Sequence, residues 1–583
     1  MTVPGHRERS EGVLTEPRHG GRSDALPTPQ CHRERSEAIS MPGASTAVAG
    51  LAGHRGAPTT GSWLALHAGL LVAVAFLAHG LATLTDHGIT WDEGESYRAG
   101  AQNLRLIAAA LASRPLPSWP WHELAGYQFA ADTLRAGFAA VVNRLVWEPG
   151  HYLGFHLANL LLATLAVALV ARLAVREGGA ALLGPLAAML LVVQPKLIAH
   201  SQANPKDVVA LVVWSAAVLA LARAARSGRL TDFALLGAAA GAALAHHVSA
   251  LLLAPLALVW TFSAGSGPWR RRFLGLLLAG GVAAGVVLLL WPWLWPDPWT
   301  RALLLFHKVR EFDVPMRVLY LGRSWKPTEL PWHYGWLSLV IATPVPLLVA
   351  ALAGIVAAFR HGSAARLCRL AALWLGVLLL ADLAAPARYD GARHLLPALP
   401  ALALLAAGGI YAAGVALWQR GAGTRRFAFA LGGLLAASLV VLAVELAAIH
   451  PYADGYLNAP ARLAFGPEAQ RRVELEYWGS SYKEGAEWLD AHAPRNSFVL
   501  VPMGPHAAAP FLAGRFQLVP HDGWRDASQP QYLMLMMREA WFTPRAARIA
   551  ASERPLFTVR RQGSTLLAIY RVAPLAPRPA ASR

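Results

Sequence analysis

The sequence predicts a polytopic α-helical membrane protein with about eleven transmembrane helices and a C-terminal α/β domain outside the membrane. Of 583 residues, 55% are apolar and only 15% are charged. Apolar runs of about 17–25 residues recur from Trp63 to about Ala448, and each is long enough to cross a hydrocarbon core of about 30 Å. Arginine clusters follow every second run, as expected of loops that alternate between two sides of a membrane.

The predicted spans lie at 63–84, 153–175, 181–199, 208–224, 231–246, 248–265, 273–291, 336–359, 370–385, 395–418 and 427–449. The region 231–265 could be one long helix, but His246-His247 falls where a short outer turn would lie. The even-numbered spans are followed by Arg172/Arg176, Arg223/Arg226/Arg229, Arg270–Arg272, Arg360/Arg366/Arg369 and Arg420/Arg425/Arg426. A cytoplasmic N-terminus puts all five clusters on the cytoplasmic side. The net charge of +18 is therefore spread over loops, without the single basic face of a nucleic-acid binder.

Three domains are expected. Residues 1–62 are rich in Arg, Gly, Pro and Ser and read as a disordered basic segment, within which Met41 is a candidate true start. Residues 63–449 form the membrane domain, and residues 450–583 form a small α/β domain. The strand-like runs of that domain are Phe498–Val501, Phe516–Val519, Tyr532–Met536, Leu556–Arg560 and Thr565–Tyr570, the last two joined by a hairpin at Gly563-Ser564.

The cysteine count does not support a disulfide framework. Cys31 lies in the polar N-terminal segment and Cys368 lies beside a predicted cytoplasmic loop, so a bond between them is not expected.

The most informative motif is Thr90–Tyr97, which follows the first span on the outer side. It carries Asp92, Glu93 and Glu95, carboxylates that could accept a proton from an acceptor hydroxyl without being buried in hydrocarbon. The alternative is a helix start, because Thr90 followed by Glu93 fits a capping box. Both interpretations can hold together.

A second polar turn on the same side runs from Gln194 to Asp207. Lys196, His200 and Lys206 could hold a phosphate, with Asp207 orienting them or binding a metal. The alternative is a plain loop in which Asn-Pro turns the chain and Asp207 caps the next helix. Two lysines beside an acidic first loop favour the functional interpretation.

The outer loop 292–335 is aromatic, with Trp291–Pro296, Leu319–Arg323 and Leu330–Tyr334 in sequence. Trp and Tyr favour the headgroup region of a bilayer, so an aromatic belt explains much of this loop. Aromatic faces also stack on sugar rings, which would be an additional role.

The fourth motif is Arg388–His394, between two late spans. Arginine on the outer side opposes the positive-inside bias, and this favours binding of a leaving phosphate over simple snorkelling. Arg388, Asp390, Arg393 and His394 are its polar members.

Together these motifs resemble the GT-C class of lipid-carrier-dependent glycosyltransferases, in the superfamily of protein O-mannosyltransferases and aminoarabinose transferases. The resemblance runs from about residue 63 to 490. It is carried by Asp92-Glu93 in the first outer loop and by an ordered chain of motifs: NPKD at Asn204–Asp207, LPWHY at Leu330–Tyr334, YDG-RH-LP at Tyr389–Pro397, HPY at His450–Tyr452, YLN at Tyr456–Asn458 and YWGSSYKE at Tyr477–Glu484. Lys206-Asp207 departs from the simpler acidic motif of many relatives, so metal binding stays open.

The resemblance implies inverting transfer of a sugar from a polyprenyl-phosphate carrier to an acceptor glycan, lipid or protein, on the extracytoplasmic face of the inner (plasma) membrane. Asp92 would be the general base and Glu93 would assist it. A divalent metal is a candidate cofactor. The residues expected to bind the substrates are Lys196, His200, Lys206, Asp207, Tyr320, Arg323, Trp332, His333, Tyr334, Arg388, Asp390, Arg393 and His394.

Two other functions fit parts of the sequence. A transporter or flippase for lipid-linked or polar solutes would carry ionisable groups inside its spans, whereas here they gather in the outer loops. A non-catalytic assembly protein that binds glycan through its tail would not need acidic and cationic outer motifs together.

Overall fold

The computed structural model describes residues 60–114, 128–145, 152–311, 315–362, 364–520 and 531–572. Except for its last three residues, the predicted disordered segment 1–62 lies outside these ranges, and so does Cys31. Cys368 is buried and unbonded.

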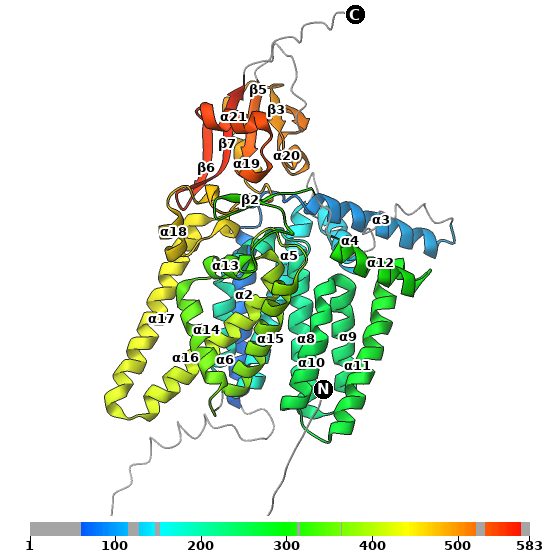
Figure 1. The fold of residues 1–583 in the computed structure, drawn as a ribbon, viewed down its shortest axis with the longest axis vertical. Coiled ribbons are helices and arrows are strands. Elements are labelled where there is room, and N and C mark those ends of the chain that lie inside the picture. The colour runs from blue at the N-terminus through cyan, green and yellow to red at the C-terminus, as the bar shows by residue number, and fades with distance from the viewer. Residues whose placement is uncertain are drawn as a thin grey trace, which may run out of the picture. The chain divides into compact units, whose positions relative to one another are not determined.

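The membrane part is a bundle of apolar helices (Figure 1). Its elements up to the long outer loop are α2 (Thr60–Ala82), α3 (Glu93–Leu111), α4 (Phe129–Leu145), α5 (Tyr152–Gly178), α6 (Leu183–Val192), α7 (Pro195–Ala203), α8 (Asp207–Ser227), α9 (Leu230–His246), η1 (Val248–Leu252), α10 (Leu253–Ala264) and α11 (Trp269–Leu290). The remaining elements are η2 (Pro292–Leu294), α12 (Pro298–Arg310), α13 (Tyr334–Ile341), α14 (Val345–Ala358), α15 (Ala365–Ala384), η3 (Arg393–Ala398), α16 (Leu399–Gln419) and α17 (Ala422–Ile449).

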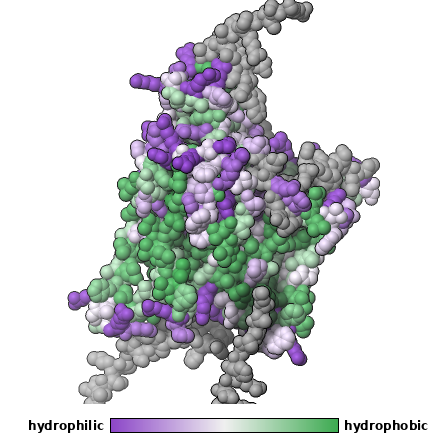
Figure 2. Space-filling model, in the orientation of Figure 1, coloured by the Kyte–Doolittle hydropathy of each residue, from purple (hydrophilic) through white to green (hydrophobic). Residues whose placement is uncertain are grey.

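Within the described residues, six helices are long and apolar enough to cross a membrane: α5, α8, α11, α15, η3 with α16, and α17. Three shorter apolar helices, within α2, at α9 and at η1 with α10, coincide with further predicted spans. Each predicted span overlaps a helix, but the total of eleven stays a prediction. Figure 2 shows apolar side chains gathered over these helices.

Two predicted spans are not straight. The span at 181–199 is split into α6 and α7, which meet at 69°, and the span at 336–359 is split into α13 and α14, which meet at 117°. Proline explains both breaks, since Pro195 begins α7 and Pro344 precedes α14, and a proline nitrogen cannot continue the hydrogen bonds of the preceding helix. The first bend turns α7 into the polar motif that ends at Asp207.

Two polar regions lie at opposite ends of helix α8 and are therefore one helix length apart. Asp207 begins the helix and Arg226 lies in its last turn, about 30 Å away for 21 residues. At the Arg226 end, the buried carboxylate of Glu177 binds Arg226 at 2.5 Å and Arg366 at 2.7 Å, which ties α5, α8 and α15 together. The arginine-rich end and the Asp207 end are therefore opposite ends of the bundle, as the charge pattern predicts.

The C-terminal region holds a five-stranded sheet with strand order β4-β3-β5-β7-β6. Its strands are β3 (Phe498–Val501), β4 (Gln517–Pro520), β5 (Gln531–Met536), β6 (Phe557–Arg561) and β7 (Ser564–Val572), close to the predicted runs. The remaining elements after α17 are η4 (Ala453–Gly455), α18 (Ala459–Phe465), η5 (Ala469–Arg471), α19 (Tyr482–His492), α20 (Pro505–Leu512), η6 (Glu539–Trp541) and α21 (Pro544–Ser552).

The pairing of these strands confirms the hairpin. Strand β3 pairs parallel with β4 and β5, whereas β7 pairs antiparallel with β5 and β6, so β6 and β7 form the predicted hairpin. A separate two-stranded ribbon in the outer loop joins β1 (Val318–Tyr320) to β2 (Arg323–Trp325). An isolated bridge from Tyr320 to Val473 connects this ribbon to the chain that leads into the sheet.

Close packing of α14 on α16 gives a test of the bundle. A Cβ atom at Gly354 would collide with the main-chain oxygen of Leu405 in α16, whereas a Cβ at Gly376 in α15 would meet open space. We expect Gly354→Val to destabilise the protein by about 1–3 kcal/mol and to lower the thermal unfolding temperature in detergent. Gly376→Val carries the same loss of glycine in a helix and is the control, and equal unfolding temperatures for the two variants would contradict this packing.

Candidate active site

Asp92, Lys206 and Arg393 come from three distant parts of the chain and meet at one point. Asp92 immediately precedes α3, Lys206 immediately precedes α8, and Arg393 begins η3. Lys206 Nζ lies 3.5 Å from Asp92 Oδ2, and Arg393 Nη2 lies 3.3 Å from the same oxygen. The acidic outer turn and two of the cationic outer turns therefore share a single cluster.

Arg393 is the centre of this cluster. Besides Asp92, its guanidinium binds Asp207 through Nε at 3.1 Å and Asp390 through Nη1 at 2.8 Å. The guanidinium also lies over the rings of Tyr389 and Trp478, with centroid distances of 5.8 and 5.4 Å. Arg393 is only 7% exposed, so three carboxylates and two aromatic faces fix its orientation.

Asp390 and Gly391 form the turn that presents Arg393. Both have left-handed backbone angles, with φ of +54° and +63°. Asp tolerates this region better than most residues, and glycine adopts it without strain. The Gly391 N–H donates to the Tyr334 hydroxyl at 2.8 Å, which anchors the turn to the LPWHY motif.

Asn204, rather than Asp207, caps helix α8. Its side-chain oxygen accepts from the N–H groups of Lys206 and Asp207 at 2.8 and 2.9 Å. Its amide nitrogen donates to Asp207 Oδ2 and lies beside His200 Nδ1, each at 2.6 Å. The capping alternative for Asp207 is therefore wrong, because its carboxylate binds Arg393 instead.

Glu93 makes only part of the predicted capping box, because its carboxylate accepts from Thr90 but Asp92, and not Thr90, is the N-cap of α3. One carboxylate oxygen accepts from the Thr90 N–H at 2.9 Å and the Thr90 hydroxyl at 2.7 Å. The other lies 2.9 Å from His156 Nε2, and Glu93 is only 3% exposed. Both oxygens are thus engaged in holding the turn that carries Asp92. His156 itself had no motif in the sequence to single it out.

Lys196 and His200 meet in a second cluster, around Asp454. Lys196 Nζ lies 2.6 Å and His200 Nε2 lies 3.2 Å from Asp454 Oδ1. The neighbouring cations hold the pKa of Asp454 below its ordinary value, against the opposing effect of burial. Because His200 also contacts Asn204, this cluster connects to Asp207 and Arg393 through side chains alone. Asp454 lies just after α17, outside every motif that drew attention in the sequence.

Arg388 and the aromatic motifs lie around the cluster rather than in it. The Arg388 guanidinium donates to the main-chain carbonyl oxygens of Asp382, Leu383 and Leu330. It therefore stabilises the local chain and does not contact the three carboxylates that bind Arg393. The predicted substrate-binding residues of the aromatic loop fall into two groups, one packed together and one exposed. The Tyr320 hydroxyl and His333 Nδ1 lie 2.6 Å apart and Tyr320 packs edge-on against Tyr334, whereas Trp332 and Arg323 are exposed.

Arg538 and Glu474 extend the cluster into the C-terminal region. Arg538 Nη2 binds Asp390 Oδ1 at 2.8 Å, and Arg538 Nε binds Glu474 Oε1 at 3.0 Å. Burial raises the pKa of Glu474 to about 7, and the nearby Asp390 charge adds to this rise while Arg538 opposes it. Two buried carboxylates thus share one guanidinium. Sequence reasoning missed both residues, since nothing local distinguishes them.

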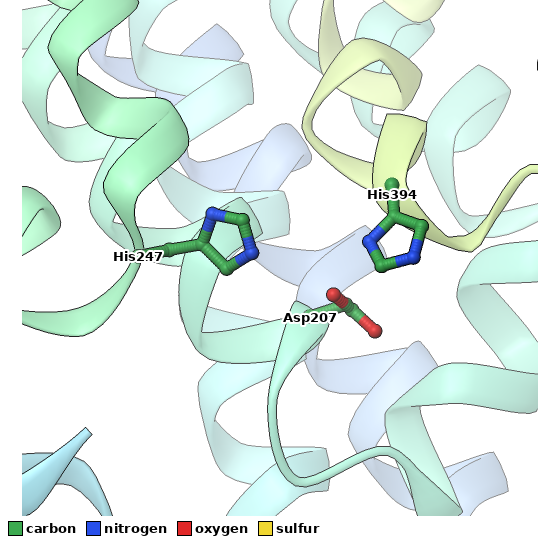
Figure 3. Close-up of side chains that lie close together, drawn as sticks. All are labelled: Asp207, His247 and His394. Atoms are coloured by element: carbon green, nitrogen blue, oxygen red, sulfur yellow. The ribbon is translucent and has the colours of Figure 1, made fainter. Parts of the chain in front are cut away.

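Asp207, His247 and His394 are the group, among the residues that the structure describes, that could hold a metal ion. One ligand atom from each lies within 4.8 Å of the others, and both imidazole rings face the carboxylate (Figure 3). His394 Nε2 is buried and has no hydrogen-bond partner among the described residues. Two imidazoles and a carboxylate suit zinc or manganese and leave coordination positions open for a ligand. The sequence had marked Asp207 and His394, but His247 only as part of a turn.

A comparison with protein families matches the part of the chain that contains the motif Asn204–Asp207. Residues 140–295, which include α5, Asp207 and His247, match the family model described as dolichyl-phosphate-mannose-protein mannosyltransferase. This match confirms the predicted resemblance to the GT-C glycosyltransferases of that superfamily. No curated protein matches the chain at a significant level.

Two solved structures show some similarity to this chain. One is ArnT from Cupriavidus metallidurans bound to undecaprenyl phosphate, with 15% identity, coverage of 88% of this chain and 98% of that chain, and a TM-score of 0.46. Another is the arabinofuranosyltransferase AftD from Mycobacteria, with 16% identity, coverage of 80% of this chain and 32% of that chain, and a TM-score of 0.40.

The raised pKa of Glu474 predicts a pH-dependent stability. Its pKa in the folded state, about 7, exceeds its ordinary value of 4.5, so the folded protein binds this proton more tightly than the unfolded chain. The free energy of unfolding should therefore fall as the pH rises from about 4.5 to about 7, by at most about 1.4 kcal/mol per pH unit from this group.

Glu474→Gln removes this titration. The difference in unfolding temperature between this variant and the wild type should therefore increase from pH 5 to pH 7.5. For the control Glu468→Gln, at an exposed ion pair, the difference from the wild type should stay constant over this range. A constant difference for Glu474→Gln as well would show that Glu474 is not protonated near neutrality.

Proposed function

We propose that this protein is a membrane glycosyltransferase that moves a sugar, with inversion, from a polyprenyl-phosphate carrier to an acceptor on the extracytoplasmic face of the inner membrane. The observation that carries the proposal is the contact of Asp92 with Arg393 and Lys206. The reaction needs a base beside the acceptor hydroxyl and cations beside the departing phosphate, and this cluster contains both within one group of ion pairs. The family match to a mannosyltransferase that uses a lipid-phosphate sugar supports the choice of donor.

The contacts of Asp92 suggest how the donor would prepare the base. In the structure, Lys206 and Arg393 both form ion pairs with one oxygen of Asp92, Oδ2. A phosphate that enters the cluster competes for the same two cations. The side chain of Lys206 is 27% exposed and 3.5 Å from Asp92, so it can move readily to the phosphate. Asp92 is then left with an oxygen able to accept the proton of the acceptor.

The charges of the cluster favour a metal ion as part of the donor site. Four carboxylates, those of Asp92, Asp207, Asp390 and Glu474, contact three cations, Lys206, Arg393 and Arg538. At a pH above the raised pKa of Glu474, four ionised carboxylates against three cations leave a formal charge of −1, which repels a phosphodiester. A divalent cation held by Asp207, His247 and His394 would change this to +1 and would stabilise charge on the departing phosphate.

The gathering of ionisable groups at helix ends also argues against transport. Asp207 and Arg393 lie at the first residues of α8 and η3, whereas a transporter pathway would place such groups near the midplane. Purified protein in vesicles, given a radiolabelled polyprenyl-phosphate sugar and envelope extract from cells that lack the protein, separates the functions. Label in the acceptor fraction supports transfer, whereas label that only crosses the vesicle membrane supports a flippase.

Asp92→Asn tests the base. Loss of a positioned general base costs about 10²–10⁴ in rate, so sugar transfer in this assay should fall by that factor while the thermal unfolding temperature stays near that of the wild type. Glu95→Gln removes an exposed carboxylate from the first turn of the same helix and should keep full activity. Wild-type transfer by Asp92→Asn would rule out its role as base.

Chelation tests the metal ion. We expect about one bound divalent metal per chain by elemental mass spectrometry, and at least a tenfold loss of transfer after treatment with EDTA that added zinc or manganese reverses. His394→Ala should lose the bound metal, whereas the exposed His361→Ala should keep it. Absence of bound metal together with EDTA-resistant transfer would contradict this part of the proposal.

A further inference from the structure

Arg538 connects the C-terminal sheet to the candidate active site. It lies just after strand β5 and is only 4% exposed. Its guanidinium binds Asp390 at 2.8 Å and Glu474 at 3.0 Å and donates to the Tyr477 carbonyl at 3.3 Å. Asp390 therefore lies between two arginines, with Oδ1 on Arg538 and Oδ2 on Arg393.

We propose that Arg538 is a positioning residue that orients Arg393 through Asp390, so that the C-terminal region completes the active site instead of merely accompanying it. This inference rests on the proposed function of Arg393 in binding the donor phosphate. Arg538 does not itself reach Asp92, and its effect on the reaction passes through the Asp390 carboxylate.

The geometry of Asp390 explains why a second arginine matters. With Arg538 on Oδ1, only Oδ2 is available to Arg393, which leaves the Nη2 of Arg393 3.3 Å from Asp92 Oδ2. Without Arg538, the Asp390 carboxylate would have both oxygens available to Arg393. A bidentate pair is the favoured arrangement of arginine and carboxylate, and it would draw the guanidinium away from the donor site.

The same region also holds the turn that carries the base. The guanidinium of Arg538 stacks over Trp541 at 4.5 Å, and Trp541 packs edge-on against Trp91, the neighbour of Asp92, with ring centroids 5.7 Å apart. His506 Nε2 lies 2.8 Å from the Trp91 carbonyl oxygen, and the Trp91 N–H donates to the Trp478 carbonyl at 2.9 Å. Arg538 and Trp541 together thus connect the base and the phosphate-binding cation to one rigid sheet.

Arg561 provides a matched control in the same domain. It is ion-paired with Glu484 at 3.0 Å, stacks over Tyr452 at 4.9 Å and donates to the His450 carbonyl. It therefore has the same kinds of contact as Arg538 and also ties the sheet to the end of α17. None of its contacts involves a residue that binds Arg393.

The experiment measures donor kinetics and binding of a polyprenyl monophosphate to purified variants in detergent. Arg538→Gln should raise the donor KM and lower kcat/KM by about 10- to 100-fold, with weaker binding of the monophosphate, because small displacements of an aligned group have effects of that size. Arg538→Lys should restore part of the loss, since it keeps a charge on Asp390. Arg561→Gln should stay within about threefold of the wild type.

A double-mutant cycle tests the route through Asp390. If Arg538 acts through this carboxylate, Arg538→Gln should add nothing to the loss caused by Asp390→Ala, whereas independent effects would multiply. Multiplying effects, or equal kinetics for Arg538→Gln and Arg561→Gln, would overturn the inference. Failure of the wild type to transfer sugar would instead overturn the proposed function. The binding assay tests the positioning role independently: if folded Arg538→Lys and Arg538→Gln bind the monophosphate as the wild type does, that role is refuted.

Discussion

The contact of one guanidinium with three carboxylates is the constraint on which the rest of this structure depends. Arg393 is nearly buried and binds Asp92, Asp207 and Asp390, each supplied by a different turn or helix end. A buried charge left without any partner is costly, by about 3–5 kcal/mol, so the folded protein must bring carboxylates to Arg393, and Asp207 and Asp390 suffice for this when Asp92 is neutralised. The constraint that shapes the fold is therefore also the one that places the proposed base beside the proposed phosphate-binding cation.

The surrounding elements serve to bring these turns together. Asn204 accepts from the first N–H groups of α8 and donates to the Asp207 carboxylate, and Glu93 with His156 fixes the turn before α3. The apolar helices keep the arginine-rich end of the bundle far from the acidic end. A base and cations at the membrane surface can act on a substrate whose tail stays in the bilayer and whose sugar faces water, without the cost of moving charge into hydrocarbon.

Hydropathy and strand patterns predicted the elements well, because they depend on local composition. The predicted span 208–224 corresponds to α8 at Asp207–Ser227, and the predicted hairpin at Gly563-Ser564 pairs as expected. The bends at Pro195 and Pro344 were missed because a hydropathy pattern gives the length of an apolar segment but not the direction of its helix axis. The first of these bends directs α7 toward the NPKD turn.

The candidate site was predictable only where polar residues gather in a short motif. Asp92, Lys206 and Arg393 were found in this way, and they do meet. Arg388 was grouped with Arg393 by proximity in sequence, but it binds main-chain carbonyls instead. Arg538 and Asp454 act through partners more than a hundred residues away, and no local pattern marks such contacts.

A structure of the protein with a non-transferable polyprenyl-phosphate sugar analogue would test the central claim most directly. We expect phosphate oxygens within hydrogen-bond distance of Arg393 and Lys206, and the contact of these cations with Asp92 to be broken. Asp92 should face the anomeric carbon from the side opposite the phosphate. A phosphate bound elsewhere, with the contacts of Arg393 to Asp92 unchanged, would contradict this claim.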